Sequence, residues 1–434
     1  MSLTIDQIAA QLQGYDPHSL RAADVNLFLQ RLVEPVRDTQ DAGIFDALGR
    51  VLAQDLVSPI SVPPHDNSAM DGYAFDGALL QDQMPLRLKV VGSTLAGDVW
   101  STAVGRADAV KITTGAVMPP GLNTVVPQEL AQLDGDTVTV PAGVLRRGDN
   151  RRCRGEDLMQ GHAALGRGEL LGPAALGLIA SLGIASVRVF RRLRVAYFST
   201  GNEILSLGEP ARPGAVYDSN RYTVFGLLRR LGIEVIDLGV VRDEPQALET
   251  AFLEAARQAD AIITSGGVSV GEADYTKAMM RKLAGPSGDV AFWRIAMRPG
   301  RPMAVGRITA LGVGGGHSAL LFGLPGNPVA VMVTFLAFVR PALLQMMGAR
   351  QGAPPMLRAR STAPIRKKAG RTEYQRGIVT RDGQGVLRVA TTGNQGSGVL
   401  SSMVQANGLI VLHHEQGDVA AEDEVDVMLF DGAL

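Results

Sequence analysis

The segment from Ser265 to Thr276, SGGVSVGEADYT, combines residues that bind anions with residues that bind metal ions. It follows the apolar stretch 261–264, which has the composition of a buried strand. Glycine-rich turns after strands present backbone N–H groups to phosphate or another oxyanion, whereas the carboxylates at the end of this segment would repel one. A divalent cation resolves the conflict, because Mg²⁺ is typically held by one or two carboxylates together with phosphate oxygens. The segment therefore predicts a site for an anion and its metal ion.

This glycine-rich segment matches neither common nucleotide-binding fingerprint. It lacks the Gly-Lys-Ser/Thr of a Walker P-loop, and its glycines do not fit G-x-G-x-x-G. The alternative is a tight turn whose glycines only permit positive φ. Serines and acids at a strand end favour a binding site. The anion-binding positions that we predict are Ser265, Gly266, Gly267 and Ser269.

Carboxylates recur at the ends of successive predicted strands. Glu203 follows the strand at 193–198, Asp243 follows 234–241, and Asp274 closes the glycine-rich segment. A helix N-cap is the alternative for each acid taken singly, but it explains all three together less well. We predict that Glu203, Asp243 and Asp274 hold Mg²⁺.

Basic and polar residues that suit an oxyanion occur further along the chain. Arg294, Arg298 and Arg301 surround a Pro-Gly turn, and guanidinium groups match tetrahedral oxyanions bidentately; a solvated basic turn is the alternative. In LPGNPV, Asn327 is placed to cap a helix whose first residue is a proline, and Pro325 precedes it. The positive end of that helix favours an anion. Arg376 and Ser397 are two further candidate donors.

The elements that must position these residues alternate between strand and helix, which is typical of a doubly wound α/β domain with ligands at the carboxyl ends of its strands. The fold class that we predict is a multidomain α/β protein. The predicted parts are an N-terminal extension (1–21), a helical linker domain (22–55 and 159–190), a β-rich inserted domain (56–158), the doubly wound α/β domain (191–346) and a small C-terminal β domain (347–434). Val25, Phe28, Leu29 and Leu32 form one helical stripe, and 55–76 is predicted as a loop with little regular structure.

Composition narrows the class of protein. The 434 residues exceed what one core usually serves, and the formal net charge of −1 provides no field for nucleic acid. Cys153 is the only cysteine, which excludes intrachain disulfides and Cys-rich zinc sites. The longest apolar run, Val329 to Val339, is shorter than the ~20 residues of a membrane span. Because no secretory signal is recognisable either, we expect a cytoplasmic protein with no membrane or nucleic-acid partner.

Taken together, the motifs of this chain resemble those of the MoeA family of molybdopterin molybdenumtransferases, which is similar to the E domain of gephyrin. They follow the family's order over about 22–430. The matching pieces are PPHDNSAMDGYA, ITTGAVMPPG, RRCRGED, YFSTGNE, YDSNR, SGGVSVGEADYT, FWRIAMRPGRPMAVG, FGLPGNPVA, EYQRG and TTGNQGSG.

The resemblance implies an elongated homodimer of four-domain subunits. It further implies insertion of molybdate into the dithiolene of adenylylated molybdopterin, with Mg²⁺ and with release of AMP. By motif match, the functional polar residues of this chain would be Asp71, Thr114, Asp157, Glu203, Asp243 and Asp274. The residues that match the family's molybdate side are Arg298, Arg301, Arg376 and Ser397. The second domain of the partner subunit is expected to bring Asp71 and Thr114 opposite Asp274. A molybdopterin adenylyltransferase and molybdoenzyme maturation proteins are candidate partners.

One departure and three rival functions remain open. The family commonly has lysine at some positions of the basic turn, where this chain has arginine at 294, 298 and 301; oxyanion binding should survive with altered geometry. The rivals are a molybdopterin adenylyltransferase-like enzyme, a scaffold of the gephyrin type and a relative that handles tungstate. The adenylyltransferase is much shorter, and nothing in the chain resembles gephyrin's additional domain. Molybdate and tungstate are too alike for one sequence to separate.

Overall fold

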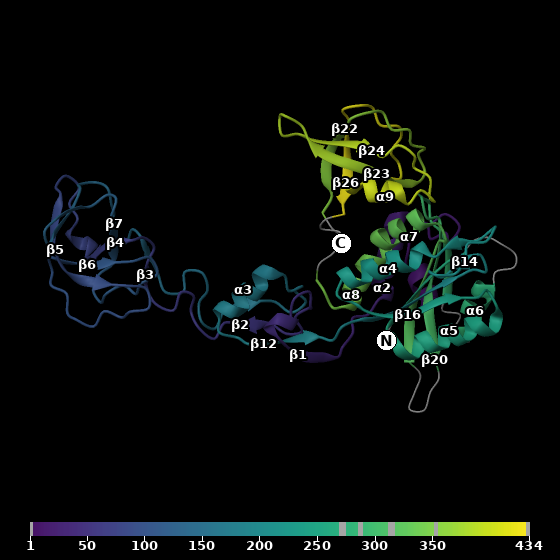
Figure 1. Ribbon diagram of the computed structural model, residues 1–434, viewed down its shortest axis with the longest axis horizontal. Coiled ribbons are helices and arrows are strands. Elements are labelled where there is room, and N and C mark those ends of the chain that lie inside the picture. Colours follow the sequence, from purple (N-terminus) through teal and green to yellow (C-terminus); the bar gives the residue numbers. More distant parts are fainter. Residues whose placement is uncertain (1–2, 269–274, 285–289, 311–316, 351–354, 431–434) are drawn as a thin grey trace.

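The molecule is elongated, with its β-rich domain at the end of an arm (Figure 1). The computed structural model describes residues 3–268, 275–284, 290–310, 317–350 and 355–430. The arm carries the β-rich domain at its tip and a small linker domain at its middle, and it joins an α/β domain on which a C-terminal β domain sits. The β-rich domain therefore lies far from the α/β domain of the same chain.

The α/β domain is built on a six-stranded sheet. Four neighbouring strands are parallel to one another. Two further strands follow at one side of the sheet, and each of them pairs antiparallel with the strand before it. In spatial order the strands are β16 (Glu234–Val241), β13 (Arg194–Thr200), β17 (Ala261–Ser265), β21 (His317–Leu324), β20 (Pro302–Ala310) and β18 (Val290–Arg294). Because alternate residues of a strand face opposite sides, Val195 and Tyr197 enter one core while Ala196 and Phe198 enter the other.

Helices cover both faces of this sheet, which confirms the doubly wound prediction. Helix α4 (Ser219–Arg230) packs in one core, and α5 (Pro245–Gln258) and α6 (Tyr275–Leu283) pack in the other. A continuous apolar helix follows β21, made of α7 (Pro328–Thr334), the π-helical segment η3 (Phe335–Val339) and α8 (Arg340–Met346).

That continuous helix, Pro328–Met346, is the one helix in the described part of the chain whose length and hydropathy would suffice to cross a membrane. However, 83% of its apolar window is buried inside the protein. A helix that neighbouring elements enclose on all sides is apolar all round, as a membrane span is. Packing within the α/β domain therefore explains the apolar composition of this helix.

The N-terminal helices pack in the α/β core. Helix α2 (Ala22–Leu32) buries its predicted stripe, Val25, Phe28, Leu29 and Leu32, and it contacts α8. We expected residues 22–55 to belong to the linker domain, but α2 shares the core of α8 and β20 instead. Its apolar stripe finds a matching surface there, which helical periodicity alone does not identify. Helix α1 (Ile5–Ala10), within the predicted extension, contacts α2 and buries Ile5 and Ile8.

The linker domain is small and lies at the middle of the arm (Figure 1). Strands β1 (Thr39–Gly43) and β12 (Ser186–Phe190) pair antiparallel, as do β2 (Leu56–Val57) and β11 (Ala163–Leu165). Helix α3 (Pro173–Ser181) and the 3₁₀ turn η1 (Ile44–Asp46) complete its core.

The β-rich domain contains regular structure where the sequence led us to expect a loop. Its sheet runs β7 (Thr124–Pro127), β4 (Gly72–Phe75), β6 (Asp108–Ile112), β5 (Leu86–Thr94), β9 (Thr137–Val140) and β8 (Gln132–Asp134), and β3 (Asn67–Ser68) pairs with β10 (Arg151–Arg152). The prediction for 55–76 was therefore wrong in part, because β4 is an interior strand with all four residues buried. At Gly72 a Cβ would lie 1.9 Å from the Val126 oxygen, so glycine is required for this pairing. A strand of four residues is too short for periodicity to reveal.

The C-terminal domain is a closed set of strands that borrows one strand from the α/β domain. Its order is β19 (Met297–Arg298), β23 (Thr372–Arg381), β24 (Leu387–Thr391), β22 (Leu357–Ser361), β26 (Glu424–Leu429) and β25 (Gly408–Leu412), and β25 also pairs with β23. Helix α9 (Ser401–Gln405) packs beside β23. This region is a small β domain, as the sequence predicted. Strand β19, which carries the arginine turn, joins the two domains, and this was not expected.

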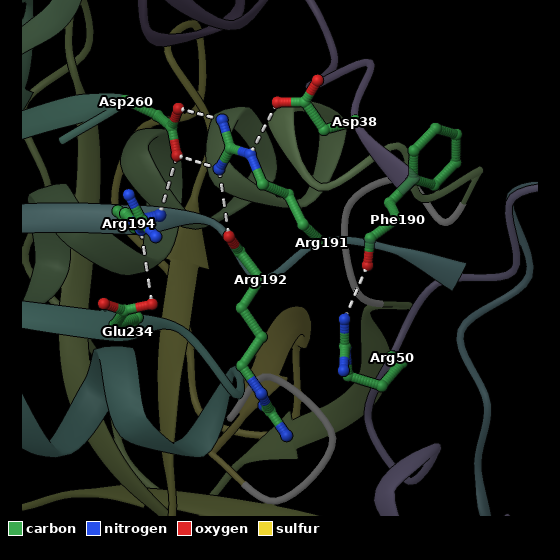
Figure 2. A network of polar contacts seen from close by, with 8 residues as sticks. All are labelled: Asp38, Arg50, Phe190, Arg191, Arg192, Arg194, Glu234 and Asp260. Atoms are coloured by element: carbon green, nitrogen blue, oxygen red, sulfur yellow. Dashed lines mark hydrogen bonds and ion pairs between the residues drawn. The ribbon is translucent and has the colours of Figure 1, made fainter. Parts of the chain in front are cut away.

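An arginine ties the arm to the α/β domain at the point where the chain crosses between them (Figure 2). Arg191 lies between β12 and β13, and its guanidinium donates to both carboxylate oxygens of Asp260 at 2.6 and 2.7 Å and to Asp38 at 3.0 Å. Asp38 precedes β1, so the two crossing segments are held together. Asp260 immediately precedes β17 and also accepts from the Arg194 N–H. The bonds to Asp260 raise the pKa of the Arg191 guanidinium by more than burial lowers it, so the net shift is upward.

We expect Arg191→Ala to lower the free energy of unfolding by about 2 kcal/mol, because it leaves the mostly buried Asp260 carboxylate without its charged partner. Chemical denaturation followed by circular dichroism measures this. Arg194→Ala is the matched control, since its ion pair with Glu234 is half exposed on both sides (Figure 2); it should change stability by under ~1 kcal/mol. Equal effects of both variants would contradict a special role for Arg191.

Candidate functional site

The carboxyl ends of the four parallel strands meet at one edge of the α/β sheet. Glu203 lies just after β13, Asp243 just after β16, Gly266 just after β17 and Asn327 just after β21. In the sheet, β13 lies between β16 and β17. The connection from β13 to β16 and the connection from β16 to β17 therefore run in opposite directions along the sheet. Loops diverge at such a switch point and leave room for a ligand. The sequence correctly placed these four residues at strand ends.

Two of the predicted carboxylates approach each other at this edge. Burial raises the pKa of Asp243 above its usual range, a bond of 3.4 Å from the Thr276 hydroxyl acts in the opposite direction, and the charge of Glu203 raises it further. The Asp243 N–H donates to the Asn202 side chain at 3.3 Å. The Glu203 carboxylate lies against Gly201, where an added Cβ would be 2.6 Å from its oxygen. The charge of Glu203 thus acts on Asp243, and we call these two carboxylates the acid pair.

This acid pair meets the donor requirement of a magnesium ion. No ion pair with a basic side chain is recorded for either acid among the residues that the structure describes. Mg²⁺ needs only one or two carboxylates when phosphate oxygens and water complete its shell. A cation would favour the ionised form of Asp243, whose pKa is raised by burial and by the charge of Glu203. Within the described ranges no three His, Cys, Asp or Glu side chains cluster as metal ligands. The third predicted ligand, Asp274, lies outside the described residues, as does Ser269.

The glycines after β17 are required by close approach. Gly266 has φ +89°, and a Cβ there would lie 2.6 Å from the Thr200 oxygen; Gly267 has φ +63°, and a Cβ would lie 2.4 Å from the Thr276 hydroxyl. The turn thus packs tightly between the end of β13 and the start of α6. Thr276, which sequence reasoning did not single out, links the glycine turn to Asp243, and its place inside the SGGVSVGEADYT segment was the available signal.

The Ser265 hydroxyl is directed into the protein. It lies 2.7 Å from the Tyr197 hydroxyl and 3.3 Å from that of Ser199, and Asn220 donates to it at 3.4 Å. Burial raises the pKa of Tyr197, so this hydroxyl cluster stays neutral. Asn220 also donates to the Gly326 oxygen at 2.7 Å. The Ser265 hydroxyl is therefore bonded within the protein, and Asn220 links it to the loop after β21, whereas we had placed Ser265 among the anion donors.

Five of the predicted oxyanion residues line one cavity of about 710 Å³ between the α/β and C-terminal domains, and Arg294 is not among them. Arg298 and Arg301 come from the turn around Pro299 and Gly300, and Pro325 and Asn327 come from the loop after β21. Ser397 comes from the C-terminal domain. Asn327 does begin helix α7, but its side chain does not cap it. Its side-chain N–H donates instead to the Ser397 hydroxyl at 2.9 Å, across the boundary between the two domains.

Arg376 lies beneath this cavity and is only 1% exposed. Its guanidinium donates to the carbonyl oxygens of Asn394 and Gly396 at 3.1 and 2.9 Å and to Ser402 at 2.9 Å. Burial, and then the charge of Arg298, lowers its pKa. Arg376 thus holds the loop that carries Ser397. It also lines a smaller adjoining cavity of about 270 Å³, together with Arg298 and Gln395. Gln395 lines both cavities and was quoted in the TTGNQGSG motif without being chosen.

The acidic and basic halves of the site adjoin. The Gly266 N–H donates to the Leu324 oxygen at 3.2 Å, and a Cβ on Gly326 would lie 3.9 Å from the Gly266 Cα. The loop after β17, beside the acid pair, therefore contacts the loop that lines the arginine cavity. A single ligand with a phosphate group at one end and an oxyanion partner at the other can span them.

The remaining predicted residues lie in the β-rich domain at the far end of the arm (Figure 1). Asp71 and Thr114 are adjacent: one Asp71 oxygen accepts from the Thr114 N–H at 2.6 Å and from its hydroxyl at 2.8 Å. These two bonds, the backbone one first, lower the pKa of Asp71. Asp157 is exposed in the same domain. Within one chain these three residues are separated from the acid pair and the arginine cavity.

Comparison with known proteins decides the family. Residues 21–183 match the N-terminal region of MoeA (domains I and II), 196–345 match a probable molybdopterin-binding domain, and 358–430 match the C-terminal region of MoeA (domain IV). A molybdopterin molybdenumtransferase of Haemophilus influenzae is 41% identical over 94% of this chain and 97% of its own length. The chain belongs to the MoeA family.

Two further MoeA relatives agree. The molybdopterin molybdenumtransferase of Bacillus subtilis is 33% identical over 86% of each chain. The crystal structure of a molybdopterin biosynthesis MoeA protein from Pyrococcus horikoshii superposes with a TM-score of 0.78, at 27% identity, and covers 95% of this chain and all of that one. The multidomain architecture described above is therefore the MoeA architecture.

Proposed function

We propose that this MoeA-family chain is a molybdopterin molybdenumtransferase, a transferase that inserts molybdenum in the biosynthesis of the molybdenum cofactor. The relatives that match nearly its whole length carry this name. Within the structure, the observation that carries the proposal is the contact between the acid pair and the arginine cavity through Gly266 and Gly326. That arrangement suits adenylylated molybdopterin and molybdate as joint substrates.

In the finer proposal, the chain's own residues bind and orient both substrates. Arg298 and Arg301 place molybdate beside the dithiolene sulfurs through bidentate bonds, while the Asn327–Ser397 contact keeps the cavity wall in place. Glu203 and Asp243 would hold Mg²⁺, which would offset the charge of the adenylate phosphates. Most of the catalysis is then positioning and electrostatic stabilisation, and AMP is the released product.

The distant residues of the β-rich domain fit a homodimer. Asp71 and Thr114 form an exposed polar pair that its own chain leaves far from the other site residues (Figure 1). In our proposal the arm of the partner subunit brings such a pair to the acid pair, and the enzyme works in the cytoplasm. A molybdopterin adenylyltransferase would supply the substrate, and molybdoenzyme maturation proteins would receive the product.

The proposal is tested by incubating the protein with adenylylated molybdopterin, Mg²⁺ and molybdate and measuring AMP release. We expect release that depends on molybdate, and we expect Arg298→Ala to raise the KM for molybdate about 10-fold or more, because it removes a charged donor. Arg257→Ala, on the last turn of α5, is a control that keeps wild-type kinetics. ATP-dependent formation of adenylylated pterin, with no molybdate-dependent release of AMP, would instead indicate an adenylyltransferase.

A further inference from the structure

The chain segment 15–21, which we call the N-terminal strap, lies along the stem of the arginine turn. The match to the N-terminal region of MoeA begins at residue 21, the last residue of the strap. Its residues run beside 294–296, the three residues that lead into β19 and Arg298. Leu20 and Ile295 form a parallel bridge.

Three backbone hydrogen bonds join the strap to this stem. The Arg294 N–H donates to the Pro17 oxygen at 2.7 Å, the Leu20 N–H donates to the Arg294 oxygen at 3.0 Å, and the Ala296 N–H donates to the Leu20 oxygen at 2.7 Å. On its other side Ala296 accepts from the Thr372 N–H of the C-terminal domain at 2.8 Å. The stem is therefore held between the strap and β23, like a strand inside a sheet.

Side chains fasten the strap at both ends. At its start, the Tyr15 hydroxyl accepts from the indole N–H of buried Trp293 at 2.9 Å, and the rings of Tyr15, Phe28 and Trp293 follow one another in contact. At its end, Arg21 forms an ion pair of 3.3 Å with Glu415 of the C-terminal domain. Strap contacts thus reach the α/β core and the C-terminal domain, the two bodies whose boundary forms the arginine cavity.

We infer that the N-terminal strap is a positioning element for Arg298 and Arg301 and that it sets the affinity of the cavity for a tetrahedral oxyanion; this inference rests on the proposed function. Arg298 and Arg301 are exposed and make no ion pair within the described part of the chain, so the backbone of the turn is what sets the positions from which their side chains extend. Removing the strap bonds would release the stem on one side. A binding site that must be ordered during binding loses affinity by the free energy of that ordering.

The strap bonds are tested with a matched pair of substitutions at one position. Leu20→Pro removes the N–H that donates to the Arg294 oxygen. Leu20→Val keeps that N–H and shortens the side chain to about the size of proline. Calorimetric titration of the full-length proteins with molybdate should give a Kd about 10-fold weaker for Leu20→Pro, or ~1.4 kcal/mol, and within about 2-fold of wild type for Leu20→Val. The KM for molybdate should rise in parallel, with the KM for adenylylated molybdopterin unchanged.

A second readout does not depend on activity. Amide hydrogen exchange of residues 295–301 should be faster in Leu20→Pro than in Leu20→Val, while exchange in β13 and β17 stays the same. If Leu20→Pro fails to fold, the double variant Tyr15→Phe with Arg21→Ala replaces it, with Arg37→Ala as the control for loss of an exposed ion pair.

The outcomes separate the two proposals. Wild-type protein that binds molybdate, together with equal Kd values and equal exchange for the Leu20 pair, would overturn the strap inference alone. Faster exchange of 295–301 in a protein whose wild type does not bind molybdate would overturn the proposed function and keep the mechanical link between strap and turn. A rise in both KM values together would show a general loss of structure and would also overturn the inference.

Discussion

Replacing Asp243 with asparagine is expected to lower the rate of molybdate-dependent AMP release about 100-fold or more without lowering thermal stability. Burial and the charge of Glu203 raise the Asp243 pKa in the folded protein. A carboxyl whose pKa is higher in the folded than in the unfolded state costs stability once it is ionised. Its replacement by a neutral amide of the same shape removes that cost, and it also removes one of the two carboxylates that we propose would hold the metal ion.

The stability difference between wild type and Asp243→Asn should depend on pH. Below the unfolded pKa of about 4, Asp243 is protonated in both states, so wild type and Asp243→Asn should differ little in melting temperature. As the pH rises through the unfolded and then the folded pKa, wild type loses stability relative to the variant, and the difference is complete above the folded pKa. Melting curves from pH 3 to pH 8 measure it.

Asp237→Asn is the matched control on the same strand. Asp237 lies on β16, and Arg221 donates to its carboxylate at 2.8 Å. Losing that partly exposed ion pair should reduce stability by under ~1 kcal/mol and leave turnover unchanged, which is the opposite pattern. Wild-type turnover in Asp243→Asn would rule out the metal-binding role that we assign to this carboxylate.

The second large effect concerns Trp293. Trp293→Ala should lower the free energy of unfolding by about 3–5 kcal/mol, as is typical when a buried large aromatic side chain is deleted. The indole is 2% exposed, packs edge-on against Phe28 at 4.9 Å between ring centres and donates to Tyr15. Its loss leaves a cavity beneath the strap and the stem of the arginine turn. Urea denaturation followed by circular dichroism measures the change.

The other tryptophan of the chain is the natural comparison. Trp100 lies in the β-rich domain, is only partly buried and packs over Gly92. Trp100→Ala should cost about 1 kcal/mol, since partly exposed side chains lose less contact on truncation. If the two variants proved equally stable, the assignment of Trp293 to the central core would be wrong. Trp293→Phe, which keeps a ring against Phe28, should recover part of the loss.

Local sequence patterns were sufficient to predict the main strands and helices of the α/β domain. Strand–helix alternation from 193 to 264 and the stripe of Val25, Phe28, Leu29 and Leu32 describe elements whose periodicity is set by each element alone. The same patterns placed Glu203, Asp243 and Gly266 at strand ends. They did not reveal β4, because a four-residue buried strand between prolines and aspartates has no measurable period.

The directions of individual side chains were beyond sequence reasoning. Ser265, Arg376 and Asn327 were chosen as anion donors by residue type, yet Ser265 and Arg376 are buried and bond to the protein itself, and Asn327 bonds to Ser397. These contacts join residues that are 68, 20 and 70 positions apart in the sequence, and Asn327 and Ser397 come from different domains. Which partner lies nearest is settled by packing, and no local rule contains it.

The amino-acid sequence by itself determined which chemistry is available: acids after parallel strands, glycines where positive φ is needed, and arginines around a Pro-Gly turn. These depend on residue type and short-range backbone preference, which each segment carries wherever it lies. Only the tertiary structure decided that β19 joins the C-terminal sheet, that the N-terminal strap supports the same turn, and that Asp71 and Thr114 stay far from the acid pair. These are contacts between distant segments, and they form where complementary surfaces bury apolar area and satisfy backbone groups together.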